Sequence, residues 1–189
     1  MAACGISAGL TFTCDDKQAA AGGLKQDFYV GNLGDIDSIS FDGNNYVSSI
    51  NFAAYTGLYR FRGVKAKSTA GSDIQRGEGG IAFYPHEVNV TLVDITPAQK
   101  EVLEDLANSE TVWILPTSTG RYEMYGWSLG LEITAGVRNS GETSQDNASR
   151  LVTLTGDQPF LEKIVLMDDG DANTLDEEST KAVLETYVV

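Results

Sequence analysis

Residues 126–130 read Gly-Trp-Ser-Leu-Gly and match the GxSxG pattern that surrounds the nucleophile of many serine hydrolases. That pattern works when a strand enters the turn and a helix leaves it, and when the histidine of the triad follows the serine in the chain. Here strand-like residues follow Gly130, and the single histidine, His86, precedes Ser128. We therefore interpret Ser128 as a turn residue and expect no catalytic residue in this chain.

The neighbouring pair His86 and Glu87 suggests acid and base chemistry at first sight. A single histidine near the start of a strand is more often structural, because a reactive imidazole needs further polar groups placed around it. We interpret His86 as a structural residue.

Residues 77–82 read Gly-Glu-Gly-Gly-Ile-Ala, a variant of the dinucleotide-binding fingerprint. The fingerprint requires a helix after it, so that the pyrophosphate lies at the helix N-terminus. Pro85 and alternating β-branched residues follow instead. We expect no bound cofactor.

Asp169, Asp171 and Asn173 have the spacing of the first calcium ligands of an EF-hand loop. Thr174 and Thr180 stand where that loop needs its glycine and its bidentate glutamate. A solvated acidic turn is favoured over a weak cation site, and no cluster of His, Cys and carboxylates has zinc spacing.

The charge of the chain narrows the classes of partner. Its 189 residues suit one domain, and 13 basic against 27 acidic side chains give a net charge of -14. A surface of this sign repels phosphate backbones and anionic membranes, which argues against tight nucleic-acid binding. The same surface would suit the wall of a passage through which a polyanion slides without sticking.

The N-terminal residues lack the basic and continuous apolar regions of a secretory signal. No run approaches the roughly 20 apolar residues of a membrane span. Cys4 and Cys14 do not form a disulfide framework, and two free thiols are expected. We expect a protein that is made in a cytoplasm and is soluble there.

Alternation of apolar and polar residues at period two is the dominant pattern, and it predicts half-buried strands. It is clearest where Val88, Val90 and Leu92 alternate with other residues, around Leu129 to Ile133, and at Val152 and Leu154. Turn-forming residues separate the runs. The pattern predicts a mainly β fold, an antiparallel sandwich or barrel, in a single domain over residues 1–167.

One packed helix is expected at about residues 96–108. Thr96 is a suitable N-cap, Pro97 suits the first helical position and Gln99 can close a capping box. An apolar face formed by Val102, Leu103, Leu106 and Ala107 should pack on the sandwich. The acidic C-terminal segment, residues 168–189, also allows a short helix at about 176–185.

Residues 66–80 contain several glycines and few apolar residues, which predicts a long loop or an extended hairpin arm. Such segments within a compact domain are usually functional or become ordered against a partner.

Several stretches together resemble tail-tube proteins of tailed bacteriophages, in particular a group of short structural proteins of phages infecting Bacteroidetes. They are the N-terminal CGISAGLTFTC and GGLKQDFYVGNL, the run VNVTLVDITPAQKEVLEDLA into the capped helix, RYEMYGWSLGLEITAG, and SGETSQDNASRLVTLTGDQPFLEKIV. The resemblance covers about residues 4–167 and contains no catalytic fingerprint.

The resemblance implies a virion tail protein, assembled in the host bacterial cytoplasm, whose copies close into rings, commonly hexameric, that stack into a tube. Viral DNA would pass along the lumen without specific binding, and sheath, terminator or baseplate proteins would be further partners. It also implies contacts between copies through the 66–80 segment, with the candidate residues Gly71, Asp73, Gln75, Arg76 and Glu78. Glu123 and Glu132 are the candidate acidic residues of the lumen.

Two alternatives remain open. Another virion component, such as a tail terminator, a connector ring or a head decoration protein, would share this charge and this fold. A carbohydrate-binding module would use Trp113, Trp127, Tyr122 and Tyr125 as a stacking platform, although packing in the core is the expected role of the tryptophans.

Overall fold

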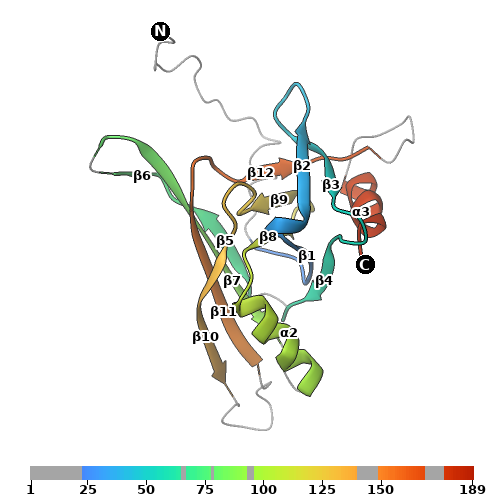
Figure 1. Ribbon diagram of the computed structural model, residues 1–189, viewed down its shortest axis with the longest axis vertical. Coiled ribbons are helices and arrows are strands. Elements are labelled where there is room, and N and C mark those ends of the chain that lie inside the picture. The colour runs from blue at the N-terminus through green and yellow to red at the C-terminus, as the bar shows by residue number, and fades with distance from the viewer. Residues whose placement is uncertain (1–22, 65–66, 78, 93–95, 140–148, 169–176) are drawn as a thin grey trace.

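The computed structural model describes residues 23–64, 67–77, 79–92, 96–139, 149–168 and 177–189. Two sheets and two α-helices form this part of the chain, and most of its regular structure is antiparallel strand (Figure 1). The expected mainly β, sandwich-like class is therefore confirmed.

The larger sheet has seven strands in the order β2-β3-β12-β9-β8-β1-β4. Neighbouring strands are antiparallel except β12 and β3, which are parallel. A short 3-10 helix, Leu33–Asp35, connects β1 to β2. The strand bounds are β1 Asp27–Asn32, β2 Ile36–Phe41, β3 Val47–Phe52, β4 Tyr59–Arg62, β8 Thr111–Pro116, β9 Tyr122–Tyr125 and β12 Lys163–Val165.

The smaller sheet has the order β10-β11-β7-β5, and β6 pairs with β7 beyond the end of β5. Val88 and Val90 on β7 lie opposite Leu154 and Val152 on β11, and all four are buried, as their alternation predicts. Leu129 differs, because it lies in the turn before β10 and is exposed. The bounds are β5 Thr69–Ser72, β6 Gln75–Arg76, β7 Ala82–Leu92, β10 Glu132–Asn139 and β11 Ser149–Gln158.

A first core fills the space between the two sheets. Trp113 and Leu115 on β8 pack there with apolar side chains of β7 and β11. Val112 and Ile114 point to the other face of the same strand, where a second core lies. Strand β8 is buried on both faces, which explains its continuous run of apolar residues.

Helix α2, Pro97–Ala107, closes one end of the first core. Its predicted capping box is present: Thr96 Oγ1 accepts from the Gln99 N–H, and the Thr96 N–H donates to Gln99 Oε1 at 2.9 Å. The expected apolar face is only partly covered. Leu106 is buried and Leu103 half-buried, whereas Val102 is 47% exposed.

Helix α3, Glu177–Thr186, lies over the second core, so the expected C-terminal helix is present and packs on the sheet (Figure 1). Leu184 is fully buried there. The Leu58 N–H donates to the Tyr187 carbonyl at 2.8 Å. Gly57 permits this close approach, because a Cβ at that position would collide with the same carbonyl oxygen.

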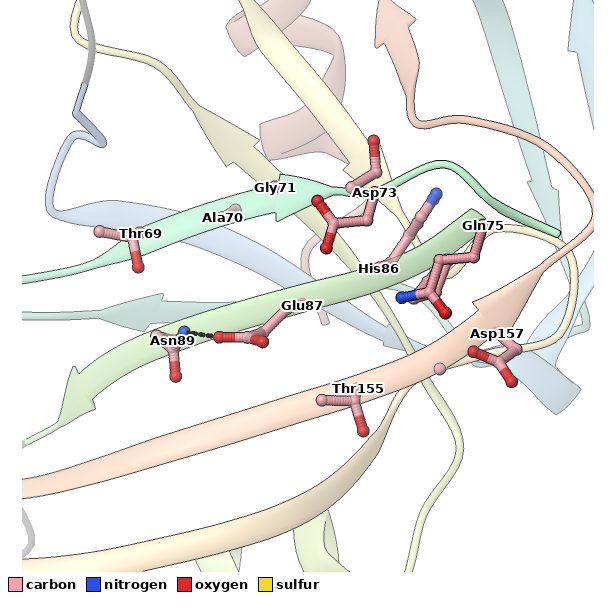
Figure 2. Close-up of a pocket in the computed structure, with 13 residues that line it drawn as sticks. Thr69, Ala70, Gly71, Asp73, Gln75, His86, Glu87, Asn89, Thr155 and Asp157 are labelled. Atoms are coloured by element: carbon pink, nitrogen blue, oxygen red, sulfur yellow. Dashed lines mark hydrogen bonds between the residues drawn. The ribbon is translucent and has the colours of Figure 1, made fainter. Parts of the chain in front are cut away.

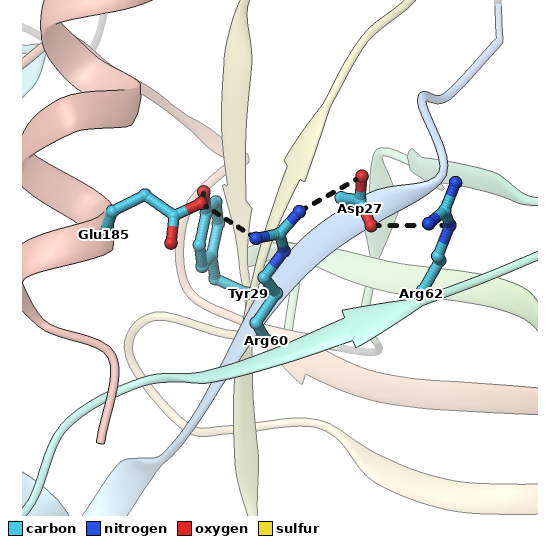
Figure 3. Close-up of polar contacts among 5 residues, drawn as sticks. All are labelled: Asp27, Tyr29, Arg60, Arg62 and Glu185. Atoms are coloured by element: carbon cyan, nitrogen blue, oxygen red, sulfur yellow. Dashed lines mark hydrogen bonds and ion pairs between the residues drawn. The ribbon is translucent and has the colours of Figure 1, made fainter.

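A polar network connects α3 to strands β1 and β4 (Figure 3). The Tyr29 hydroxyl donates to Glu185 Oε1 at 2.7 Å, and Arg60 lies 3.5 Å from the same oxygen. Arg60 also pairs with Asp27 at 3.4 Å, and Arg62 approaches Asp27 at 3.7 Å. Burial, together with the bond to Glu185, raises the pKa of the Tyr29 hydroxyl, which therefore stays protonated as a donor.

Candidate self-association surface

The sequence of residues 66–80 allows a long loop or a hairpin, and the described residues of this segment form a hairpin. Its residues pair along β7 first through β5 and then through β6, and the Asp73 N–H donates to the Pro85 carbonyl between them at 2.9 Å. A turn closes the hairpin, with Gly77 N–H donating to the Ile81 carbonyl and Gly80 at a φ of 74°. We call residues 73–77 and 79–83 the arm, and Figure 1 shows it projecting from the body of the fold.

The arm exposes apolar side chains. Ile74 is 69% and Ile81 is 78% exposed. Exposed large aliphatic side chains on a projecting hairpin are typical of a contact with another molecule, and no residue in the described part of this chain covers these two. The contact residues predicted from the sequence in this segment are glycine, polar and charged residues, and the two isoleucines were not among them.

The candidate contact residues Gly71, Asp73, Gln75 and Arg76 lie together along this hairpin. Glu78 lies outside the described residues. Gly71, Asp73 and Gln75 border a groove of about 570 Å³ on the outer face of the smaller sheet (Figure 2).

Polar and acidic side chains of β7 and β11 form the floor of this outer groove. Thr153 Oγ1 donates to Asn89 Oδ1 at 2.6 Å. The Asn89 amide donates to Glu87 Oε1 at 2.5 Å (Figure 2). Asp73 and Asp157 add two further carboxylates to the lining. The lining of the groove is therefore rich in polar and acidic side chains.

The two candidate lumen residues lie on different sheets. Glu132 begins β10, is exposed, and lies opposite Thr155, which in turn lies opposite Glu87 on β7. Glu132 and Glu87 thus share the outer face of the smaller sheet. Glu123 is half-buried on β9 of the larger sheet, where its carboxylate accepts a hydrogen bond from the Tyr125 hydroxyl at 2.8 Å.

His86 is fully buried, and both of its ring nitrogens have partners. Nε2 lies 3.1 Å from the Phe160 carbonyl and donates to it, while Nδ1 accepts from the Gly126 N–H at 3.2 Å. Burial lowers the pKa of the imidazole below its ordinary value of 6.5, so the ring stays neutral. This arrangement ties β7 to two loops and supports the structural role expected from the sequence.

The GxSxG residues form a closed turn between β9 and β10. Gly126 and Gly130 have φ values of 70° and 77°, and the Gly130 N–H donates to the Gly126 carbonyl at 2.8 Å. Buried Gln158 accepts from the N–H groups of Ser128 and Leu129 and donates to the Gly130 carbonyl. A strand follows this turn, not the helix that a nucleophile elbow requires.

The four aromatic residues of the carbohydrate alternative do not form an exposed platform. Trp113, Tyr122 and Tyr125 are 0%, 7% and 3% exposed and belong to the two cores. Trp127 alone lies near the surface, where its ring stacks on Phe160 and meets the edge of Phe41. The Lys163 ammonium lies 5.6 Å from the Trp127 ring centre and close to the other two rings.

This cluster of Phe41, Trp127, Phe160 and Lys163 was not anticipated from the sequence. Its members come from β2, β12 and two separate connections, so no local spacing marks them. The isoleucines of the arm were detectable in principle, because Ile74 and Ile81 are the only large aliphatic residues in a polar stretch.

No protein-family model, curated protein or solved structure matches this chain. In the described part of the chain, no helix is long and apolar enough to span a membrane. Those same residues contain no group of three or more His, Cys, Asp or Glu side chains placed to hold a metal ion. The Asp169, Asp171 and Asn173 motif lies outside the described residues.

Proposed function

We propose that this chain is a virion structural protein whose copies assemble into stacked rings, with hexamers as the expected stoichiometry, that form a phage tail tube. One observation carries the proposal: the smaller sheet has two open edges and a projecting arm. Strands β10 and β5 each have a strand partner on one side only among the described residues. An open edge pairs readily with an edge of another copy.

The orientation of the β5 backbone supports such pairing. The Asp73 N–H points to β7, so at alternate positions the N–H groups of Ala70 and Ser72 point to the open edge. Four residues lie side by side in one row across the smaller sheet: Glu132, Thr155, Glu87 and Gly71. If β5 of one copy pairs with β10 of the next, this row continues from copy to copy. The sheets would then form a closed wall with an acidic face.

An acidic wall fits the passage of DNA. Carboxylates at Glu87, Glu132 and Asp157 would not pair with phosphates, so the polymer would slide without specific binding. Such a protein would be assembled in the host bacterial cytoplasm, and its tube would contact terminator, sheath or baseplate proteins at its surface and ends. We propose no enzymatic activity for it.

Negative-stain electron microscopy of the purified protein tests the proposal. Long hollow rods or stacked rings are expected. Assembly that stops at single rings would favour the terminator or connector alternatives. A monomer at high concentration would overturn the proposal.

A matched pair of variants tests the edge. Ala70→Pro removes an N–H that points away from β7, so it should prevent ring closure while the monomer keeps its fold. Ala70→Gly keeps that N–H and serves as the control, which should still assemble. Equal assembly of both variants would exclude β5 as the pairing edge.

A further inference from the structure

A groove between β4 and α2 lies at the end of the fold away from the arm. It consists of two hollows of about 360 and 450 Å³ that share Arg60, Phe61 and Val102. We call it the helix groove. Strand β4 is the last strand of the larger sheet, so its outer edge is open here among the described residues.

The helix groove has an apolar centre. Phe61 stacks on Phe28 and is half-buried, and Val102 is 47% exposed although it belongs to the helix face that its spacing predicts to be buried. Leu103 also lines the groove. A partly covered helix face of this kind retains apolar area that a second molecule can remove from water.

Opposite charges mark the two ends of the helix groove. Arg62 lines one hollow and Asp105 the other. Arg60, between them, is held by Asp27 and Glu185, and these acidic neighbours, Glu185 foremost, raise the pKa of its guanidinium (Figure 3). The Asp105 carboxylate is exposed and has no ion-pair partner in the described part of the chain.

The arm carries matching groups. Ile74 and Arg76 are two residues apart on an extended segment, so their side chains point to the same side. Arg76 is exposed and has no ion-pair partner among the residues described. The arm thus presents an apolar side chain, Ile74, next to a cation, Arg76. The helix groove presents an apolar surface next to a carboxylate, Asp105.

The arm cannot reach the helix groove of its own chain. Strand β7 begins at Ala82, which pairs with Arg76 of the arm, and ends at Leu92, which lines the groove. A strand of that length separates the two features by roughly 33 Å at about 3.3 Å per residue. Figure 1 shows the arm at the upper left and α2 at the lower end.

We propose that the helix groove receives the arm of a second copy, with Ile74 packing on Phe61 and Val102 and with Arg76 paired to Asp105. This inference rests on the proposed function and identifies the acceptor for the arm. The contact joins unlike surfaces at opposite ends of the molecule, so each copy can bind one neighbour above and one below. Contacts of this type continue from copy to copy without closing, which suits the stacking of rings.

A charge exchange tests the pairing. Arg76→Glu and Asp105→Arg each place like charges together, and both positions are exposed, so the melting temperature should stay unchanged. Each single variant should form rings but raise the protein concentration needed for rod growth by about tenfold, because the small effect of one pair is repeated around the ring. The double variant, with the charges exchanged, should return to within about threefold of the wild type.

Mixing provides a second, independent test. Ile74→Asp disables the arm and leaves the helix groove intact, whereas Val102→Asp does the reverse. Each variant alone should give single rings by electron microscopy and sedimentation. A mixture of the two should give pairs of rings, because the intact arms of the Val102→Asp ring can bind the intact grooves of the Ile74→Asp ring. Rods of more than two rings should not form.

The outcomes separate the two proposals. If the wild type forms no ring, the proposed function and this inference both fail. If the wild type forms rods that the Ile74→Asp and Val102→Asp variants also form, the helix groove is not the acceptor while the proposed function stands. A double charge variant that stays as defective as the single variants overturns the Arg76 to Asp105 pairing.

Discussion

At the scale of single residues, two buried polar side chains hold the loops of this protein in place. His86 joins β7 to the Gly126 N–H and the Phe160 carbonyl, and Gln158 fills the turn at Ser128 and Leu129. Both side chains are almost completely buried, so each unmade bond would leave a polar group without water.

The buried His86 predicts a loss of stability in mild acid. Burial lowers the folded-state pKa of His86, so the unfolded chain takes up a proton near pH 6.5 while the folded chain does not. The contribution of His86 to the free energy of unfolding is therefore complete above about pH 6.5. Below that pH the free energy of unfolding falls by no more than about 1.4 kcal/mol per pH unit.

Urea unfolding at about pH 7.5 and about pH 5.5 measures this loss. The variant His86→Gln cannot titrate in this range and retains a side-chain donor, so its stability should fall less between the two pH values. An equal fall for both proteins would show that His86 is protonated in the folded state or does not contribute.

Gln158 predicts a second effect. Gln158→Leu leaves the Ser128 and Leu129 N–H groups without their acceptor and should lower the free energy of unfolding by about 2 kcal/mol. Ser128→Ala, in the same turn, keeps the hydrogen bonds of Gln158 to the backbone and should change the free energy of unfolding by less than about 0.5 kcal/mol. A large effect of Ser128→Ala, or loss of an esterase activity with it, would argue for the rejected nucleophile.

At the scale of elements, α3 is the part whose role the sequence left most open. Its sequence is short and acidic, which allowed a helix without fixing its contacts. The structure buries Leu184 in the second core and joins Tyr187 to Leu58, so the helix covers the far face of the larger sheet. Without it, apolar residues such as Met124 and Ile114 would lose part of their cover.

Packing of α3 predicts a large penalty for shortening Leu184. Leu184→Ala should lower the free energy of unfolding by about 3 kcal/mol, the range typical of buried leucines. Lys181→Ala on the exposed side of α3 is the control, with an expected change below about 0.5 kcal/mol. Chemical unfolding measures both. A change for Leu184→Ala no larger than the control would mean that α3 does not pack on the sheet in solution.

At the scale of the whole molecule, charge opposes assembly while edges and apolar groups favour it. The net charge of -14 makes every copy repel every other at long range. The contacts proposed for the arm and for the β5 edge act only at short range, so the balance between the two depends on screening.

This balance predicts that salt promotes assembly. Raising the ionic strength from about 0.01 M to about 0.15 M shortens the screening length from about 30 Å to about 8 Å. We expect light scattering to detect rods at lower protein concentration in the higher salt. Neutralising the outer-face carboxylates with Glu87→Gln and Glu132→Gln should reduce this salt dependence. Assembly that weakens with salt would indicate that ion pairs, not edges and apolar contacts, dominate the interfaces.

The sequence by itself determined the features that depend on neighbours along the chain. The capping box at Thr96 and Gln99 and the inward alternation of Val88 and Val90 arise from residues within a few positions of each other, so their spacing was sufficient. The strand-like residues after Gly130 excluded a nucleophile elbow for the same reason.

Only the tertiary structure decided which distant residues meet. It placed Gln158 in the turn at Ser128, put Glu123 and Glu132 on different sheets, and left Val102 exposed although its helical spacing predicted burial. Sheet order and the cover of each face arise from contacts between segments far apart in the chain. A local sequence pattern indicates that a side chain favours burial. Whether other segments cover that side chain depends on the packed fold.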